Sequence, residues 1–255
     1  MATCTDTATC NSELLKEGIH SVANGTSPTD RFVQESRFGN WFLRTRTWHE
    51  HVLTRALDDL QAMLPPSTRC HRVLDIGCGY GHAFAELVAR FGSREIVGLD
   101  ADATLLDAAR PRAAKCSATV ELLVGNAADI KRPDGDFDMV FCHQTFHHLV
   151  EQEAAMAEFW RVLKPGGWLL FAESTRKYIH SLPIRLLFRH PMEVQRSAEE
   201  YLGMIRAAGF TLPPSRISTP YLWWSRSDLG VLEFLGRPTP ADREETLINA
   251  VAAKP

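Results

Sequence analysis

Three glycines fall within five positions of the stretch VLDIGCGYGHAF, residues 73–84, directly after an apolar run. Gly77, Gly79 and Gly81 would weaken a strand or a helix, so something at this position requires bare backbone. A glycine turn lets backbone approach a ligand, but it also simply lets a helix pack close to a sheet. The loop lacks the Gly-Lys-Ser/Thr of a P-loop, and His82 stands where a dinucleotide fingerprint has its third glycine.

Asp100 ends the next β-rich run, EIVGLD, about 20 residues after the glycine loop. At that position an acidic side chain can accept hydrogen bonds from both hydroxyls of a ribose. The alternative is that Asp100 is a solvated aspartate at a strand end. The position of Asp100 relative to the glycine loop favours the role in ribose binding. Together the two features predict a ligand that carries a ribose and does not depend on phosphate recognition.

Hydrophobic periodicity predicts the elements that position these residues. Helical spacing predicts a helix that starts at Trp41 and is stopped by Pro65 and Pro66, with an apolar face of Trp41, Trp48, Val52, Ala56, Leu60 and Met63. Beyond it, β-rich runs alternate with helical patterns. The expected strands are RVLDIG, EIVGLD, VELLVG, FDMVFCH and WLLFAES, followed by YLWW and VLEFLG as candidate closing strands.

This alternation predicts an α/β fold, a doubly wound and mostly parallel sheet with helices on both faces. We expect Pro111 to end or kink the helix DATLLDAAR, and Ser197 with Glu200 to form a capping box. In such a sheet, ligands bind at the carboxyl ends of the strands. Asp100, Asn126 and His143 should therefore meet the glycine loop on one rim.

Four motifs in this order resemble the class I S-adenosylmethionine-dependent methyltransferases, of the small-molecule type related to ubiquinone and menaquinone biosynthesis enzymes. The matching stretches are VLDIGCGYG, IVGLDAD, DGDFDMVFCHQTFHHL and RVLKPGGWLLFAE, which run from about residue 70 to residue 174, under half of the chain. The resemblance implies a Rossmann-like fold, S-adenosylmethionine as cofactor, and methyl transfer.

Carried over by position, the resemblance implies a set of cofactor-binding residues. They are Asp75, Gly77, Cys78, Gly79, Asp100, Ala101, Asn126, Ala127, Cys142 and His143. The glycine loop would line the methionine and ribose part, and Asp100 would hold the ribose hydroxyls. The family usually has Asp where this chain has Asn126, so we expect weaker adenine binding there rather than none. Backbone near Cys142 and His143 would face the methionine amino group.

The stretch CHQTFHHL supplies the candidate catalytic residues, His147 and His143. A histidine titrates near neutrality and suits proton removal from a hydroxyl or an amine. Packing at the sheet edge is the alternative role for both. Methyl transfer from a sulfonium needs mainly alignment and exclusion of water, so a base is required only when the acceptor arrives protonated. No carboxylates or cysteines are spaced to join these histidines, so we expect no metal site.

Three further regions are candidates for acceptor specificity. Arg44 and Arg46 either reach the carboxylate of the cofactor or are solvated helix charges. The insertion at residues 175–196 mixes apolar and basic residues and is expected to be a lid, with a membrane-surface contact as the alternative. In the stretch PYLWWSRSDLGVLEF, Tyr221, Trp223 and Trp224 could line an apolar acceptor pocket or shield the sulfonium by cation–π contact, and a plain core strand is the alternative.

Composition places these motifs in an ordinary globular protein. Of its 255 residues 45% are apolar, and the formal net charge of −3 gives no reason to expect nucleic acid as a partner. We expect no stable membrane insertion, no signal peptide, reduced cysteines and a cytoplasmic location. The expected organisation is a mobile tail, 1–35, and one domain, 36–255, made of an N-terminal helix (36–66), a cofactor-binding core (70–174), the lid and a C-terminal part of the sheet (197–255).

The sequence therefore predicts an enzyme that transfers a methyl group from S-adenosylmethionine to a small, partly apolar or aromatic molecule. One alternative is an NAD-dependent oxidoreductase on a similar fold, which His82 and the LKPGG turn argue against. The other is a non-catalytic S-adenosylmethionine-binding module that regulates a partner. The acceptor atom and the oligomeric state stay open.

Overall fold

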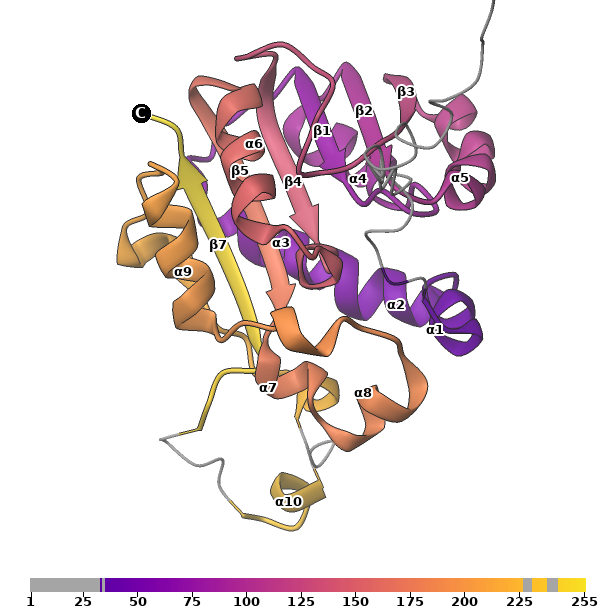
Figure 1. Ribbon diagram of the computed structural model, residues 1–255, viewed down its shortest axis with the longest axis vertical. Helices are drawn as coiled ribbons and strands as arrows, with labels where there is room; N and C mark the ends of the chain where they lie inside the picture. The colour runs from indigo at the N-terminus through magenta and orange to yellow at the C-terminus, as the bar shows by residue number, and fades with distance from the viewer. Residues whose placement is uncertain (1–32, 34, 227–230, 238–242) are drawn as a thin grey trace, which may run out of the picture.

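A seven-stranded sheet in the order β3-β2-β1-β4-β5-β7-β6 forms the centre of the molecule (Figure 1). The computed structural model describes residues 33, 35–226, 231–237 and 243–255. The strands are β1 (Arg72–Ile76), β2 (Glu95–Asp100), β3 (Thr119–Val124), β4 (Phe137–His143), β5 (Leu163–Ser174), β6 (Ile217–Ser218) and β7 (Leu247–Ala253). β1 to β5 pair in parallel and β7 is antiparallel to its two neighbours. The expected Rossmann-like, mostly parallel sheet is confirmed.

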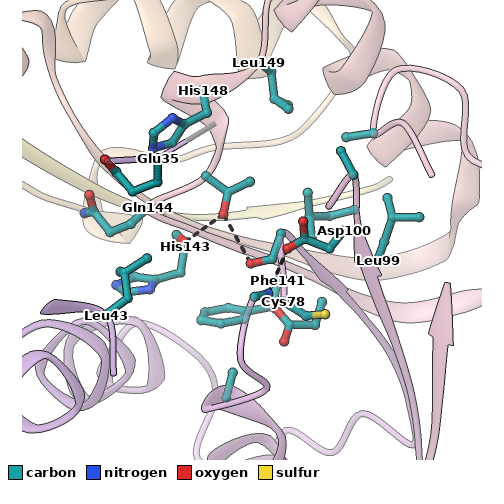
Figure 2. A pocket seen from close by; sticks show the side chains of 18 of the residues that line it. Glu35, Leu43, Cys78, Leu99, Asp100, Phe141, His143, Gln144, His148 and Leu149 are labelled. Carbon is teal, nitrogen blue, oxygen red and sulfur yellow. Dashed lines mark hydrogen bonds between the residues drawn. The ribbon is translucent and has the colours of Figure 1, made fainter. Parts of the chain in front are cut away.

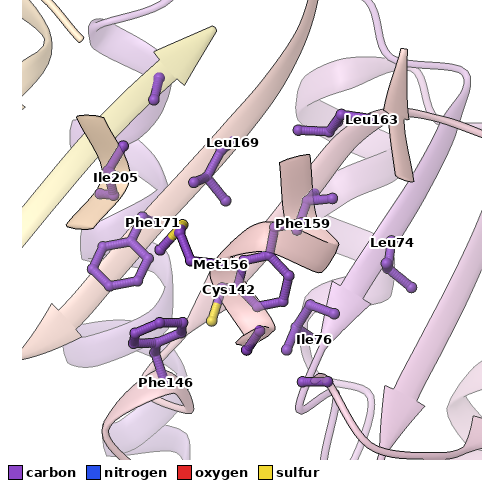
Figure 3. Close-up of a cluster of buried hydrophobic side chains, with 14 of the residues drawn as sticks. Leu74, Ile76, Cys142, Phe146, Met156, Phe159, Leu163, Leu169, Phe171 and Ile205 are labelled. Atoms are coloured by element: carbon purple, nitrogen blue, oxygen red, sulfur yellow. The ribbon is translucent and has the colours of Figure 1, made fainter. Parts of the chain in front are cut away.

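Helices cover both faces of this sheet, as the alternation predicted. One face carries α3 (Thr54–Ala62), α4 (Ala83–Phe91) and α5 (Ala103–Lys115), and the other carries α6 (Gln152–Val162) and α9 (Ala198–Ala207). Successive strand side chains point to opposite faces. In β4, Val140 and Cys142 therefore pack under α6, whereas Met139 and Phe141 pack under α3 and α4. Figure 3 shows the hydrophobic core on the α6 and α9 face of the sheet, where Cys142 lies between Phe146 and Met156.

The N-terminal helical region is interrupted rather than continuous. It consists of α1 (Arg37–Phe42), α2 (Arg46–Trp48), a π-helical stretch (His49–Leu53) and α3. The Thr45 side chain accepts a hydrogen bond from the Trp48 backbone N–H, which starts a new helix after a turn. Trp41 is 61% exposed and lies outside the buried face, which Leu53, Leu57 and Leu60 form. The expected N-terminal helical extension is confirmed, and Trp48, Ala56, Leu60 and Met63 of the predicted apolar face pack on the core. The prediction of one continuous helix with Trp41 on that face was wrong.

The closing strands were also misplaced. YLWW falls partly in a 3-10 turn (Trp223–Ser225), and VLEF is the short helix α10 (Val231–Phe234). The sheet closes instead with β6 and β7. Aromatic and branched residues favour strands, but a segment becomes a strand only where it finds a partner, and β7 finds β5. The core-strand alternative for Tyr221, Trp223 and Trp224 is therefore wrong.

Two smaller features complete the comparison with the sequence. α5 runs on through Pro111 to Lys115, so the proline does not end it. The capping box at the start of α9 is confirmed, because the Ser197 side chain and the Glu200 carboxylate each bond the other residue's backbone N–H. The expected N-terminal tail, residues 1–35, lies almost wholly outside the described residues. Its two cysteines, Cys4 and Cys10, lie outside them as well. No helix in the described ranges is long and apolar enough to cross a membrane.

The segment after β5 lies beyond the carboxyl ends of β4 and β5 (Figure 1). It contains α7 (Arg176–Ile179), α8 (Leu182–Leu187) and a 3-10 turn (Met192–Val194). The N-terminal region meets it there: Ser36 Oγ donates to the Leu187 carbonyl, and the Arg189 N–H donates to Glu35 Oε1. The ring of Phe188 packs edge-on against a ring from α1, Phe38. Two chain segments far apart in sequence thus form one cover over the rim.

Candidate active site

The three glycines after β1 serve two different purposes. All three have positive φ, 64° at Gly77, 50° at Gly79 and 72° at Gly81. A Cβ at Gly77 would lie 2.2 Å from the Thr145 side chain, and one at Gly81 would lie 2.4 Å from the Phe84 ring. At Gly79, the nearest described atom would be a backbone oxygen at 3.9 Å. Packing therefore explains two of the glycines, and only Gly79 has free space beside it that a ligand could use.

Alanine at these positions should separate the two purposes. We expect Gly79→Ala to lose little more than the roughly 1–2 kcal/mol of left-handed strain, yet to weaken binding of the adenosyl cofactor. Gly77→Ala should lose more stability, because its Cβ also meets Thr145. Thermal melts and calorimetric titration would measure both effects. Equal melting losses with unchanged cofactor affinity in Gly79→Ala would show that the loop serves packing alone.

Beside this loop lies a cavity of about 190 Å³, here called the glycine-loop cavity (Figure 2). Asp100 forms one side of it, and its two carboxylate oxygens accept the backbone N–H groups of Gly79 and Asp102, each at 2.9 Å. Each oxygen keeps a further lone pair, so both can still accept a hydroxyl. In Figure 2, Glu35, Gln144 and His148 lie at the other end. The rim residues therefore converge as the sequence predicted.

The charges of the glycine-loop cavity are all of one sign. Its wall includes the carboxylate residues Glu35, Asp75, Asp100 and Glu151, and none of the described residues that line it is Lys or Arg. Asp75 is 3% exposed, and its Oδ2 has no hydrogen-bond partner among the described residues. Burial and the nearby Asp100 raise the Asp75 pKa well above its usual value. Such a cavity suits a ligand with positive charge and opposes one with phosphates.

The structure brings together most of the residues implied for the cofactor. Those that line the glycine-loop cavity are Asp75, Gly77, Cys78, Gly79, Asp100, Ala101, Asn126, Ala127 and His143. Cys142 does not, because strand alternation turns its side chain to the other face, where its thiol lies 3.6 Å from Glu173. Asn126 Oδ1 accepts the Ala128 N–H at 2.9 Å, so this oxygen is already partly used in a turn.

Arg44 and Arg46 do not reach this cavity. The Arg44 guanidinium lies over the Tyr80 ring, and Arg46 pairs with Glu50 at the surface. The positions of both arginines fit the alternative prediction, in which they are charged residues of the helical region outside the site. Sequence reasoning missed Trp48, Leu43 and Glu35, which enter the wall through the fold of the N-terminal region and carry no motif that marks them.

A second cavity, of about 320 Å³ and here called the histidine cavity, lies under the cover formed by α1, α7 and α8. Much of its wall is aromatic or aliphatic, with the rings of Phe38, Phe42, Tyr178, Phe188, Trp223 and Trp224. The polar exceptions include His147, His148 and His190. Five residues line both cavities: Glu35, Leu43, Trp48, Gln144 and His148. The two cavities are therefore neighbours that share one wall.

Gln144 marks this shared wall with unusual backbone geometry. Its φ of 51° makes it the only non-glycine residue with positive φ in the described ranges. Its Oε1 accepts a hydrogen bond from Ser174 Oγ at 2.6 Å, which holds the side chain at the end of β5. Backbone strain of this kind costs of order 1–3 kcal/mol and persists where the surroundings impose it.

His147 lines the histidine cavity and not the glycine-loop cavity. Its Nδ1 lies 2.6 Å from Glu173 Oε2, and both side chains are buried. Glu173 Oε1 accepts the backbone N–H groups of Thr145 and Phe146 at 2.8 and 2.7 Å, so the carboxylate is held rigidly. With Nδ1 on the carboxylate, Nε2 of His147 is the nitrogen left for other partners.

The other histidines of the site are held neutral by burial. Burial lowers the pKa of His143 to about 4 and that of His190 to about 3, and the pKa of His148 falls well below its usual value. His143 packs between Phe141 and Trp48, and its Nε2 has no partner among the described residues. A histidine with so low a pKa is a weak proton acceptor, so the geometry favours His147 over His143 as a base.

Comparison with known proteins agrees with this architecture. Residues 74–171 match the family model of a methyltransferase domain. The demethylmenaquinone methyltransferase of Deinococcus radiodurans is 36% identical over 121 residues, which cover 47% of this chain and 50% of that protein. A fatty-acid O-methyltransferase of Mycolicibacterium smegmatis is 27% identical, over 56% of each chain. This chain thus spans about half the length of these curated relatives.

Solved structures extend the likeness of the fold to most of the chain. The S-adenosylmethionine-dependent methyltransferase of Aquifex aeolicus superposes with a TM-score of 0.60 at 19% identity, over 85% of this chain and 97% of that one. The [4+2]-cyclase SpnF reaches 0.58 at 24% identity, over 78% and 80%. Identities this low show the fold alone. The match of residues 74–171 to a methyltransferase-domain model and the likeness of the fold both agree with the resemblance of the motifs to class I S-adenosylmethionine-dependent methyltransferases.

Proposed function

We propose that this protein transfers a methyl group from S-adenosylmethionine in the glycine-loop cavity to a small, largely apolar acceptor in the histidine cavity. The observation that carries the proposal is the charge of the first cavity, with its four carboxylate residues and no described lysine or arginine. S-adenosylmethionine has a sulfonium and an ammonium group, whereas NAD carries a pyrophosphate. Asp75 Oδ2, which has no hydrogen-bond partner in the part of the chain that the structure describes, and the open side of Gly79 also fit such a cofactor.

When bound, the sulfonium supplies an already activated methyl group. The protein's own contribution is then to orient two ligands across the wall that the cavities share, and to keep water out. Gln144 and His148 lie at that wall, and the aromatic rings of α1 and the α7–α8 segment close the acceptor side. Positioning of this kind can supply a large part of a rate enhancement.

An acceptor with a hydroxyl or another weakly acidic group also needs to lose a proton. The pair of Glu173 and His147 can take it: Glu173 holds the Nδ1 proton, which leaves the lone pair of Nε2 directed away from it. The aromatic lining favours an acceptor with apolar or aromatic bulk. Methylation of a lipid-like acceptor, as the names of the quinone and fatty-acid relatives describe for those proteins, fits this lining.

The likeness to a cyclase warns that the fold does not dictate the reaction. Calorimetric titration with S-adenosylmethionine, S-adenosylhomocysteine and NADH in parallel tests the cofactor. We expect micromolar binding of both adenosyl ligands and none of NADH; binding of NADH alone would overturn the proposal. Transfer of an isotopically labelled methyl group to hydroxylated apolar compounds then tests the reaction. Cofactor binding without turnover on any acceptor would favour the regulatory-module alternative.

A cytoplasmic location and the absence of a nucleic-acid partner stay predictions. The lid role of residues 175–196 is likewise part of this proposal. It is supported by the position of α7 and α8 on the wall of the histidine cavity.

A further inference from the structure

Three histidines meet in the histidine cavity from two separate parts of the chain. His147 and His148 belong to the 3-10 turn Phe146–His148, and His190 belongs to the segment between α8 and the next 3-10 turn. One ring nitrogen from each lies within 4.8 Å of the other two. The ring centroids of His148 and His190 are 4.8 Å apart, and those of His147 and His148 are 4.4 Å apart. His190 joins the others only through the tertiary fold.

The carboxylate of Glu173 orients one member of this cluster, His147. Glu173 Oε2 lies 2.6 Å from His147 Nδ1, and the whole Glu173 side chain is buried. Carboxylate–histidine pairs of this kind fix the ring of a metal-ligating histidine and raise its basicity. Within the described ranges, no hydrogen bond engages the ring nitrogens of His148 or His190. Three imidazole nitrogens are therefore available for one ligand.

The donor set selects the kind of ion. Imidazole nitrogens without carboxylate oxygens suit zinc, nickel or copper, and do not suit magnesium or calcium. Zinc binds imidazole nitrogen at about 2.0–2.1 Å in tetrahedral geometry, which puts neighbouring nitrogens roughly 3.3 Å apart. The cluster would have to close by up to about 1.5 Å from its present spacing. Ring rotation and a shift of the segment that carries His190 can supply this movement.

We propose that His147, His148 and His190 form a binding site for a divalent transition-metal ion of the zinc class. Three protein ligands leave the fourth position open toward the histidine cavity, where water or an acceptor oxygen can bind. Bound metal would occupy Nε2 of His147, so metal binding and proton removal by this residue exclude each other. It would also tie the segment between α8 and the next 3-10 turn to the end of β4. The site does not depend on the proposed reaction.

The test is calorimetric titration of zinc chloride into chelator-treated full-length protein without S-adenosylmethionine. We expect one saturable site in the wild type, and at least a 100-fold loss of affinity in His190→Ala. His180→Ala is the matched control, because His180 belongs to the same insertion (residues 175–196) but lies at the end of α7 and contacts the Met192 carbonyl. It should bind zinc like the wild type. Glu173→Gln should bind about 10–100-fold more weakly, as loss of an orienting partner does.

The chain contains 10 histidines, so binding at the surface must be told apart from this site. Absence of saturable binding in the wild type, or equal affinities in His190→Ala and His180→Ala, would overturn the proposal. Hydrogen exchange supplies a second readout. Zinc should slow exchange across residues 182–194 in the wild type and in His180→Ala, but not in His190→Ala. The same zinc effect in all three proteins would contradict the assignment.

Discussion

Replacing His147 with alanine is expected to lower turnover about 10²–10⁴-fold, the usual contribution of a positioned general base. The affinity for S-adenosylmethionine should change little, because His147 lines the histidine cavity and not the glycine-loop cavity. His147→Gln is a second variant that fills more of the space left by the imidazole. It controls for a packing defect in His147→Ala. Steady-state kinetics with a hydroxylated acceptor, together with calorimetry for the cofactor, measure both quantities.

Glu173→Gln tests the same pair without changing its shape. The amide can still accept the two backbone N–H groups that the carboxylate receives from Thr145 and Phe146. Its NH₂ group would then face His147 Nδ1, which moves the ring proton to Nε2 and removes the lone pair that we propose takes the proton of the acceptor. We expect kcat to fall toward that of His147→Ala with KM nearly unchanged. Wild-type rates in both variants, across pH, would leave positioning as the whole mechanism.

Asp100→Ala is expected to weaken S-adenosylmethionine binding by about one to two powers of ten, since charge-assisted hydrogen bonds contribute roughly 1.5–3 kcal/mol. Asp100 also accepts the N–H groups of Gly79 and Asp102, so alanine disturbs the loop as well as the ribose contact. Asp100→Asn keeps one oxygen and the shape, and should show a smaller loss. Calorimetric titration gives both affinities.

Asp102→Ala is the matched control for Asp100. Its carboxylate caps α5 by accepting the Thr104 N–H, and it does not line the glycine-loop cavity. Its loss should cost about 1 kcal/mol of stability while leaving the cofactor affinity unchanged. Unchanged affinity in Asp100→Ala would remove this residue from the site, and equal losses in Asp100→Ala and Asp102→Ala would point to general disturbance of the loop.

The sequence by itself determined the parallel core and the rim that carries the glycine loop. Hydrophobic periodicity is a local property, so the runs that became β1 to β5 and the helices between them could be found without contacts. Gly79 and Asp100 could be placed together because the carboxyl ends of adjacent parallel strands meet at one edge. The order of the motifs was therefore enough to predict a ligand site at this edge of the sheet.

Only the tertiary structure decided the histidine cavity. His147 contacts Glu173, which lies 26 positions later in the sequence. His190 lies near His147 but belongs to the segment between α8 and the next 3-10 turn. β7 was missed because its run, LINAVAA, is buried up to its last residue and shows no alternation. The closing strands were placed instead on exposed aromatics such as Trp223, which is 60% exposed. Pairing between distant segments depends on the free energy of burying them together, and local spacing does not encode that.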